Sequence, residues 1–496
     1  MNIEYIIVQA GGKGTRLEHL TVNKPKAIVP VNNLPMIFHL FRKFPDKKFV
    51  IIGDYKKEVF RKYLNCFADV RYIFTEAEGS GTCSGVKNAL RFIPDDTPFM
   101  LIWSDLILPE EYELPSENGN YVGISQTFNC RWSYINGGFQ ETPSTENGVA
   151  GMFIFENKAL ISDVEQSGEF VRWLNDKKIP FMETGLAGTR EFGLISEYNK
   201  LSVEKCRPFN RMTEENGILT KEGIDEQGKK LASRERSWYA FVRKLGFSAL
   251  PEIYSLEPIR MEKIHGKNIY EYGGFSYEKK KAILEKIVGS LSELHGLRGC
   301  PADSFSVWEA YVTKTFDRLE KIRGLVPLSD EKYITVNKRS CRNVFMNRDE
   351  VERRLLKYKC PEFRLIHGDC TFSNIMLRND EEPVLIDPRG YFGSTELFGD
   401  AAYDWAKLYY SIKGNYDRFN LKEFRLDIGD EIKLDIASNS WEDMERDFLA
   451  MIDIPAEDIQ LLHAIIWLSL TTYAWQDYDS ICGAFYNGIY YLEEIL

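Results

Sequence analysis

Two groups of residues, far apart in the chain, have types and spacings suited to phosphate chemistry. The first is a glycine-rich stretch, Gln9-Ala10-Gly11-Gly12-Lys13-Gly14-Thr15-Arg16-Leu17, followed by Lys24-Pro25-Lys26. The second is His367-Gly368-Asp369, followed by Asn374 and then by Ile386-Asp387-Pro388. The first is typical of a loop that wraps a nucleoside triphosphate, and the second of a loop that moves a γ-phosphate onto a hydroxyl. We therefore expect two separate phosphate-handling sites.

The first group combines a flexible backbone with two cations. Glycine lets backbone N–H groups approach a phosphate closely and tolerates unusual dihedral angles. The Arg16 guanidinium can donate two hydrogen bonds to a triphosphate, and Lys26 can supply a second positive charge to it. The glycines alone are equally consistent with a simple tight turn, and it is the cations at this spacing that favour a nucleotide site. We predict that nucleotide is bound by Ala10, Gly11, Gly12, Gly14, Thr15 and Arg16, with catalytic roles for Arg16 and Lys26.

The elements that must position this group alternate between strands and helices. Continuous apolar runs at 5–8, 49–53 and 99–103 predict buried parallel strands, and residues 35–44 and 84–92 predict helices between them. This alternation predicts a doubly wound, Rossmann-like α/β domain. Sites in such domains lie at the carboxyl ends of the strands, where two of these motifs fall.

This part of the chain resembles the sugar-phosphate nucleotidyltransferases, whose signature is G-G-x-G-T-R-L followed by P-K and P-V. Here P-K is Pro25-Lys26 and P-V is Pro30-Val31. The segment Gly81-Thr82-Cys83-Ser84-Gly85 is similar to the family's G-T-A-G segment. The resemblance implies that Gly81 and Thr82 lie near the base and sugar of the nucleotide.

The same resemblance implies a metal site and one departure from the family pattern. Asp105, in Trp103-Ser104-Asp105, stands where the family has a Mg²⁺-binding Asp. Glu191, in Glu191-Phe192-Gly193, stands where the family has a second metal-binding Asp. The family often has E-K-P, whose Lys grips the substrate phosphate, but this chain has Thr142 in place of that Lys. We therefore expect the acceptor phosphate to be held in another way, or the acceptor to be unusual.

From about residue 206 the pattern changes. Strands at 216–222 and 259–264 and an amphipathic helix at 229–245 predict a small mixed lobe. A mostly helical region follows, with predicted helices at 277–296, 304–324, 349–358 and 457–475 and strands at 364–366 and 384–386. A small mixed lobe followed by a large helical lobe is typical of a two-lobed, protein-kinase-like α+β domain.

The second group resembles the catalytic loop of aminoglycoside phosphotransferases and choline kinases, which share the protein-kinase architecture. The resemblance implies that Asp369 accepts the proton of the attacking hydroxyl and that Asn374 and Asp387 hold Mg²⁺. His367 is predicted to buttress the loop. Asp400 and Asp404 are predicted to be structural.

Further residues complete this predicted kinase site. Lys221 fits the strand lysine that grips the α- and β-phosphates, and Glu235 on the next helix is its expected ion-pair partner. Residues 261–265, which include Glu262, are the predicted hinge whose backbone meets adenine. Arg389 either contacts a phosphate or an anionic acceptor, or forms a salt bridge.

Two aromatic groups have two interpretations each. The first group consists of Trp103, Trp132, Tyr134 and Trp173. Because aromatic faces bind quaternary ammonium groups well, these residues could surround an acceptor of that kind. Alternatively, they belong to the hydrophobic core. The second group consists of Trp467, Tyr473, Trp475 and Asp477, on a predicted helix near the end of the chain. These residues either line the acceptor cleft of the kinase or form an aromatic stripe packed in the core.

Length and composition limit the class of protein. A chain of 496 residues suits two or three domains, which we place at 1–205 (nucleotidyltransferase), 206–268 (kinase small lobe) and 269–496 (kinase large lobe). No apolar run approaches the ~20 residues that span a bilayer, and the start has no basic signal region, so we expect a cytoplasmic protein without membrane insertion. Nine scattered cysteines predict reduced thiols. The net charge of −11 argues against nucleic-acid binding.

Together the two resemblances imply a bifunctional enzyme with Mg²⁺ as cofactor. A kinase would phosphorylate a small hydroxyl compound with ATP, and a transferase would couple the product to a second NTP (CTP, UTP, GTP or dTTP) with release of pyrophosphate. A sugar acceptor is favoured, giving an NDP-activated precursor for surface or capsular glycan. The alternatives are an amino alcohol such as choline, giving CDP-choline, or a nucleotide-binding protein with one inactive half. The sequence leaves open whether the protein forms a homo-oligomer.

Overall fold

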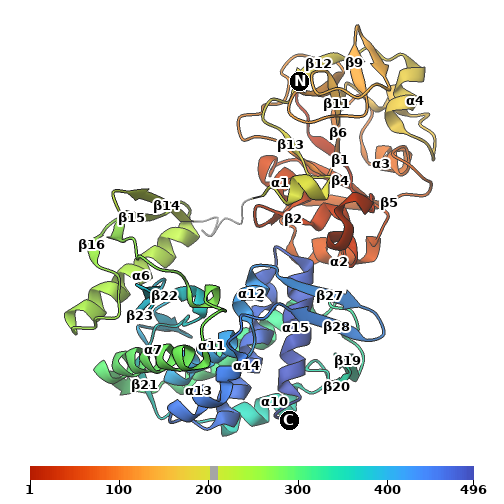
Figure 1. Ribbon diagram of the computed structural model, residues 1–496. Helices are drawn as coiled ribbons and strands as arrows, with labels where there is room; N and C mark the ends of the chain where they lie inside the picture. Colours follow the sequence, from red (N-terminus) through yellow and green to blue (C-terminus); the bar gives the residue numbers. More distant parts are fainter. Residues whose placement is uncertain (202–209) are drawn as a thin grey trace. The chain divides into compact units, whose positions relative to one another are not determined.

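The computed structural model describes residues 1–201 and 210–496 (Figure 1). These residues form two compact units. The first contains residues 1–201 together with Trp475–Asp479, and the second contains residues 210–474 and Ser480–Leu496. The predicted domain boundary between 205 and 206 lies outside the described residues. No helix within the described ranges is both long and apolar enough to span a bilayer.

A nine-stranded mixed sheet forms the centre of the first unit. Its main path runs β10-β9-β11-β6-β1-β4-β5; off this path, β8 pairs with β11, and β12 pairs with β8. The bounds are β1 Tyr5–Gln9, β4 Lys48–Gly53, β5 Arg71–Glu76, β6 Phe99–Trp103, β8 Tyr121–Ser125, β9 Ser133–Ile135, β10 Gly138–Gln140, β11 Gly148–Phe155 and β12 Met182–Gly185. The three predicted apolar strands are β1, β4 and β6, and they lie side by side in parallel, as expected for strands buried on both faces.

Helices pack against this sheet through apolar residues. They are α1 Met36–Lys43, α2 Lys57–Phe67, α3 Val86–Ala89 and α4 Phe170–Lys177. The predicted helix at 84–92 is shorter than expected, because α3 gives way to a 3₁₀ turn at Leu90–Phe92. One large buried cluster joins the strands to α3 and α4, and it includes Leu101, Phe153 and Phe170. The fold class is therefore the predicted α/β class.

The second unit begins with a small mixed lobe. Its four-stranded antiparallel sheet has the order β14-β15-β17-β16, with bounds β14 Asn210–Glu215, β15 Ile218–Gly223, β16 Ile253–Leu256 and β17 Ile259–Glu262. The long helix α6 (Glu226–Lys244) packs against β15. Asp225 caps α6, since its side chain accepts a hydrogen bond from the Gly228 N–H at 2.7 Å. This cap fixes the start of the helix that carries Glu235.

The rest of the second unit is mainly helical, as predicted (Figure 1). Its principal helices are α7 Tyr277–Leu297, α9 Lys314–Ile322, α10 Arg348–Lys357, α11 Ala401–Ile412 and α14 Ala456–Leu470. The single helix predicted at 304–324 is divided into α8 (Ser304–Trp308), a π-helical turn at Glu309–Thr313 and α9. Strand β21 (Glu362–Leu365) and the hairpin of β22 (Ile375–Arg378) and β23 (Glu382–Leu385) flank the second motif.

Candidate active sites

The glycine-rich loop of the first unit leaves the end of β1. Ala10 donates its N–H to the Ile52 carbonyl of β4 (3.0 Å), so the loop begins at the carboxyl end of the sheet. At Gly11 a Cβ would lie 2.8 Å from the Cβ of Asp54, and Gly14 has a φ of 66°. Both positions therefore require glycine. Thr15 and Arg16 follow, and both are exposed.

Lys26, Asp105 and Glu191 meet beside this loop. Asp105 follows β6, and Glu191 ends the short strand β13 (Arg190–Glu191), which pairs antiparallel with β7 (Leu106–Ile107). The Phe192 N–H also donates to the Asp105 carbonyl at 3.2 Å, so this pairing brings the two carboxylates together. Lys26 forms an ion pair with Asp105, and its Nζ lies 4.0 Å from Glu191 Oε1.

The charges of this cluster fit a divalent cation. Burial and the neighbouring Asp105 charge raise the pKa of Glu191 to about 7. Burial acts against ionisation of Asp105 too, but the Lys26 ammonium keeps the pKa of Asp105 below its usual value. Two close carboxylates are suitable oxygen ligands for Mg²⁺, which usually binds one or two carboxylates plus substrate phosphates. Within the ranges described, no cluster holds three or more His, Cys, Asp or Glu side chains placed to bind a metal.

The loop that contains Gly81 and Thr82 is tied to the first motif by a residue that the sequence did not single out. The Gln9 side-chain amide donates to the Thr82 carbonyl. The Thr82 hydroxyl accepts the N–H of Phe170, the first residue of α4, at 2.7 Å. Gly81 has a φ of 79°, and a Cβ there would lie 2.3 Å from the Gly168 carbonyl oxygen. Thr82 therefore joins β1 to α4, and its hydroxyl is engaged within the fold.

Two exposed arginines lie beside the position where the family's lysine is replaced by Thr142. The Thr142 N–H donates to the Gln140 carbonyl at 2.8 Å. The adjacent Glu141 carboxylate pairs with both Arg131 and Arg172. These arginines carry cationic charge at this end of β10, which the motif pattern did not indicate.

The aromatic candidates of the first unit belong mainly to its core. Trp132, Tyr134 and Trp173 are members of the large buried cluster, and Trp103 packs against it. The Tyr134 hydroxyl donates to the Phe181 carbonyl at 2.9 Å. Of the late group, Trp467 is fully buried, whereas Trp475 and Asp477 belong to the first unit.

In the second unit, Lys221 links two carboxylates from different elements. Its Nζ lies 2.8 Å from Glu235 Oε2 and 2.5 Å from Asp387 Oδ1. Lys221 and Glu235 are buried, whereas the Asp387 side chain is half exposed. Burial, only partly offset by Lys221, raises the pKa of Glu235 to about 7. Asp387 follows β23 with a φ of 53°, a left-handed backbone conformation that is uncommon for a residue other than glycine.

The loop around Asp369 is held by buried hydrogen bonds. Asn374 donates its side-chain N–H to the Asp369 carbonyl at 2.8 Å. His367 accepts the Asp369 N–H at Nδ1 and donates from Nε2 to the Ile386 carbonyl at 2.9 Å. The Asp404 carboxylate on α11 accepts the N–H groups of His367 (2.8 Å) and Gly368 (2.7 Å). His367 and Asp404 therefore support the loop, as predicted.

The Asp369 carboxylate is bracketed by two cations. Its Oδ2 lies 3.2 Å from the Arg389 guanidinium, and its Oδ1 lies 3.0 Å from Lys407 Nζ on α11. Arg389 therefore forms the salt bridge that was one of its two predicted roles. Lys407 was not identified from the sequence, because no motif marks it within a helix that is buried along most of its length.

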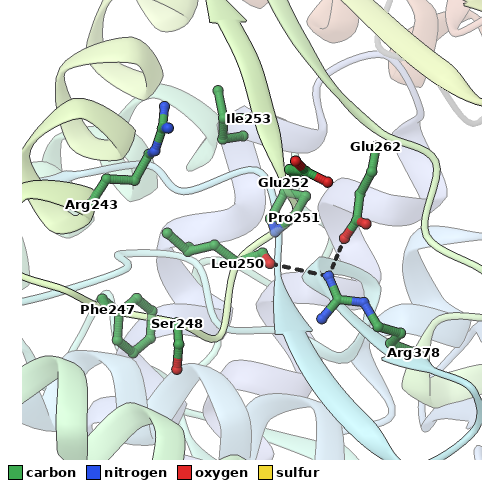
Figure 2. Close-up of a pocket in the computed structure, with 9 residues that line it drawn as sticks. All are labelled: Arg243, Phe247, Ser248, Leu250, Pro251, Glu252, Ile253, Glu262 and Arg378. Atoms are coloured by element: carbon green, nitrogen blue, oxygen red, sulfur yellow. Dashed lines mark hydrogen bonds and ion pairs between the residues drawn. The ribbon is translucent and has the colours of Figure 1, made fainter.

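The predicted hinge borders a separate cavity of about 390 Å³ (Figure 2). The Glu262 side chain, at the end of β17, pairs there with Arg378 of β22, which also donates to the Leu250 carbonyl at 3.3 Å. Lys221, Asp369 and Asp387 are not among the described residues that line this cavity. Glu262 therefore uses its side chain structurally, and adenine contact by the hinge backbone stays a prediction.

Comparison with known protein families assigns a class to both parts of the chain. Residues 5–115 match the nucleotidyl transferase family model, and residues 221–428 match the model of the phosphotransferase enzyme family. The chain therefore contains a nucleotidyltransferase domain followed by a phosphotransferase domain. Both resemblances in the sequence are confirmed, and both domains belong to enzyme families.

Individual relatives match 20% to 32% of this chain. The bifunctional protein GlmU of Methanococcus maripaludis strain C5 is 30% identical over 125 residues, which cover 25% of this chain and 30% of that protein. The UTP–glucose-1-phosphate uridylyltransferase AglF of Haloferax volcanii is 35% identical over 107 residues, covering 20% and 43%. The glucose-1-phosphate cytidylyltransferase of Salmonella typhimurium is 23% identical over 199 residues, covering 32% and 77%. The chain thus spans about 30% of the length of the GlmU relatives that it matches.

Solved structures match 40% of the chain. The inositol-1-phosphate CTP transferase of T. maritima has a TM-score of 0.34 and 15% identity, covering 40% of this chain and 92% of that one. The CTP:phosphocholine cytidylyltransferase LicC of Streptococcus pneumoniae has a TM-score of 0.32 and 22% identity, covering 40% and 98%.

Proposed function

We propose that this protein catalyses two successive reactions on one small molecule. The phosphotransferase domain uses ATP to phosphorylate a hydroxyl group, and the nucleotidyltransferase domain then joins the phosphomonoester to the nucleotidyl group of a second NTP. The observation that carries this proposal is the presence of two separate clusters, each with a lysine between two carboxylates. These clusters are Lys26 with Asp105 and Glu191, and Lys221 with Glu235 and Asp387.

In the first reaction, Asp369 accepts the proton of the acceptor hydroxyl as that oxygen attacks the γ-phosphorus of ATP. The new O–P bond forms as the bond from the γ-phosphorus to the bridging oxygen breaks, and ADP leaves. Lys221, fixed by Glu235, holds the α- and β-phosphates. Asn374 and Asp387 would hold Mg²⁺, which neutralises charge on the phosphates when bound.

In the second reaction, an oxygen of the phosphomonoester attacks the α-phosphorus of the NTP. The bond between the α-phosphorus and the oxygen that bridges it to the β-phosphorus breaks, and pyrophosphate leaves. Because the attacking oxygen is already anionic, this step needs positioning and charge neutralisation more than a general base. Arg16 and Lys26 supply positive charge, the loop from Ala10 to Gly14 binds the phosphates, and Asp105 and Glu191 would hold Mg²⁺.

We favour a sugar or sugar-like acceptor over an amino alcohol. Relatives of this chain include proteins named for glucose 1-phosphate. The tryptophans and tyrosine proposed to frame a quaternary ammonium are packed in the core. The product would then be an NDP-activated precursor for surface or capsular glycan, made in the cytoplasm where NTPs are available.

The test supplies Mg²⁺ and ATP with each of CTP, UTP, GTP and dTTP against a panel of sugars and amino alcohols. We expect ADP to form only with a hydroxyl acceptor, and pyrophosphate only when the phosphorylated acceptor and one preferred NTP are present. EDTA should stop both reactions, and added Mg²⁺ should restore them. Failure to form ADP or pyrophosphate with any acceptor would instead identify a nucleotide-binding protein without turnover.

A further inference from the structure

The region around Asp369 contains four cationic side chains, which is more positive charge than the single Asp369 carboxylate can neutralise. They are Lys314, Arg318, Arg389 and Lys407. Arg389 and Lys407 contact Asp369 directly. Lys314 and Arg318 lie one helical turn apart on the same face of α9. The groups that act most strongly on the Lys314 charge are Arg318, Arg389 and Lys407, with Asp369 opposing them. This part of the second unit is therefore strongly positive.

Two members of this cluster, Lys314 and Arg318, are destabilised in their charged form. Burial, together with the charges of Arg318, Arg389 and Lys407, lowers the pKa of Lys314 to about 7. Burial also lowers the pKa of Arg318. A group of partly buried like charges opposes the compact state unless an anion offsets it, and such perturbed groups gather at functional sites.

Aromatic rings and a small cavity shape the same region. Arg318 and Arg389 lie 6.0 and 5.8 Å from the centre of the Tyr473 ring, and Lys314 lies 5.7 Å from that of Tyr403. A cavity of about 20 Å³ is bounded in part by Lys314, Arg389 and Tyr403. Aromatic rings therefore lie against three of the four cations, and two of these cations, Lys314 and Arg389, also line the cavity.

We infer that the acceptor of the phosphotransferase domain is an anionic hydroxyl compound, whose carboxylate or phosphate group is held by Lys314, Arg318 and Arg389. This inference rests on the proposed function, because it names the substrate class of the Asp369 site. Any acceptor must bring its hydroxyl to Asp369, and it then lies beside the cations that bracket that carboxylate. A cationic acceptor would meet like charge there, whereas an anion makes charge-assisted hydrogen bonds.

The triphosphate is the competing occupant. ATP phosphates have their own cation in Lys221, which lies with Glu235 and Asp387. Lys314 and Arg318 come from α9 and lie over the rings of Tyr403 and Tyr473, whereas Lys221 comes from β15. We therefore assign Lys314 and Arg318 to the acceptor, and this assignment predicts which Michaelis constant changes when they are removed.

The first experiment measures ADP formation by the full-length protein with matched acceptors. One series is glycerol, glycerate and glycerol 3-phosphate; a second is glucose, glucuronate and glucose 6-phosphate; choline is the cationic member. We expect at least one anionic member to exceed its neutral partner about tenfold or more in kcat/KM, and the carboxylate and phosphate arms identify the preferred anion. Preference for a neutral or cationic acceptor would overturn the inference but leave the proposed kinase function intact. If no acceptor yields ADP, both the inference and the proposed kinase function are wrong.

The second experiment compares Lys314→Gln and Arg318→Gln with Lys321→Gln, an exposed control on the same helix. With the best anionic acceptor, the first two changes should raise its KM about tenfold or more and change the KM for ATP less than about twofold. Lys321→Gln should leave both constants unchanged. Arg318→Lys should recover part of the affinity, which a purely structural role would not require. A rise confined to the KM for ATP would assign the cluster to the triphosphate and reject the inference.

Discussion

Lys221 Nζ and Glu235 Oε2 lie 2.8 Å apart in the second unit, joining β15 to α6. Their side chains are only 7% and 6% exposed, so the pair is shielded from competing water. Strand and helix come from separate segments, and each side chain fixes the other. The pair therefore fixes the position of the Lys221 ammonium, which we propose binds the phosphates of ATP.

Glu235→Gln should impair the phosphotransferase reaction selectively. Without the Glu235 charge, Lys221 retains Asp387 as its partner and is drawn toward the proposed metal ligand. We expect kcat/KM for ATP to fall about tenfold to a hundredfold, equivalent to about 1.4–2.7 kcal/mol of transition-state stabilisation. Steady-state ADP formation measures this effect. The control is Glu226→Gln, an exposed residue paired with Lys229 at the start of α6, which should behave as wild type.

Asp369→Asn and Asp105→Asn should separate the two reactions. The first removes the proposed proton acceptor, so ADP formation should fall by at least about a hundredfold while pyrophosphate release from a supplied phosphomonoester persists. The second removes a proposed metal ligand, so the opposite pattern is expected. Both reactions are measured on each purified, folded variant. Loss of both activities from either single change would contradict two independent sites.

The sequence predicted the fold class and most residues of the two clusters because their motifs are local. The glycine-rich loop and the His367-Gly368-Asp369 segment each need a specific backbone path, which leaves a short recognisable pattern. Apolar runs predicted β1, β4 and β6 for the same reason, since a strand buried on both faces must be continuously apolar. The roles of the predicted residues stay predictions, although the structure brings Lys26, Asp105 and Glu191 together.

The residues that the sequence missed owe their positions to tertiary structure. Lys314 and Lys407 lie on α9 and α11, and they converge on Asp369 only when these helices pack. Gln9 looked like one more residue of a strand, but its amide reaches a loop far along the chain. The division of the predicted 304–324 helix is similar, because a π-helical turn precedes Lys314 and sets the direction in which α9 presents it.

Asp404→Ala should destabilise the second unit by removing the support of the loop that contains His367, Gly368 and Asp369. It would leave the buried N–H groups of His367 and Gly368, and the His295 side chain, without their shared carboxylate. An unsatisfied buried donor costs about 1–3 kcal/mol, so we expect a loss of several kcal/mol in the free energy of unfolding. Denaturant unfolding monitored by tryptophan fluorescence measures it. Glu457→Ala, which removes an exposed ion pair with Arg354, should change stability by less than about 1 kcal/mol.

The phosphotransferase reaction with an anionic acceptor should weaken as pH rises through about 7. Lys314 faces Arg318, Arg389 and Lys407 as well as Asp369, and its pKa of about 7 means that it is charged below that pH and neutral above it. Loss of one charge-assisted hydrogen bond costs about 1.5–3 kcal/mol, so kcat/KM for the acceptor should fall about tenfold or more between pH 6 and pH 8.5. The pH profile of kcat/KM reports the free enzyme, which makes it the measurement of choice.

Two variants separate this effect from titration of ATP or of other groups. In Lys314→Gln the decrease above pH 7 should disappear, with kcat/KM already low at pH 6. Lys314→Met should also raise the midpoint of thermal unfolding, because a cation whose pKa is lowered to about 7 in the folded protein opposes folding below its unfolded pKa. That gain should shrink as pH rises from 7 toward 10.5, since wild-type Lys314 is then neutral in the folded protein. An unchanged pH profile in Lys314→Gln would show that another group titrates.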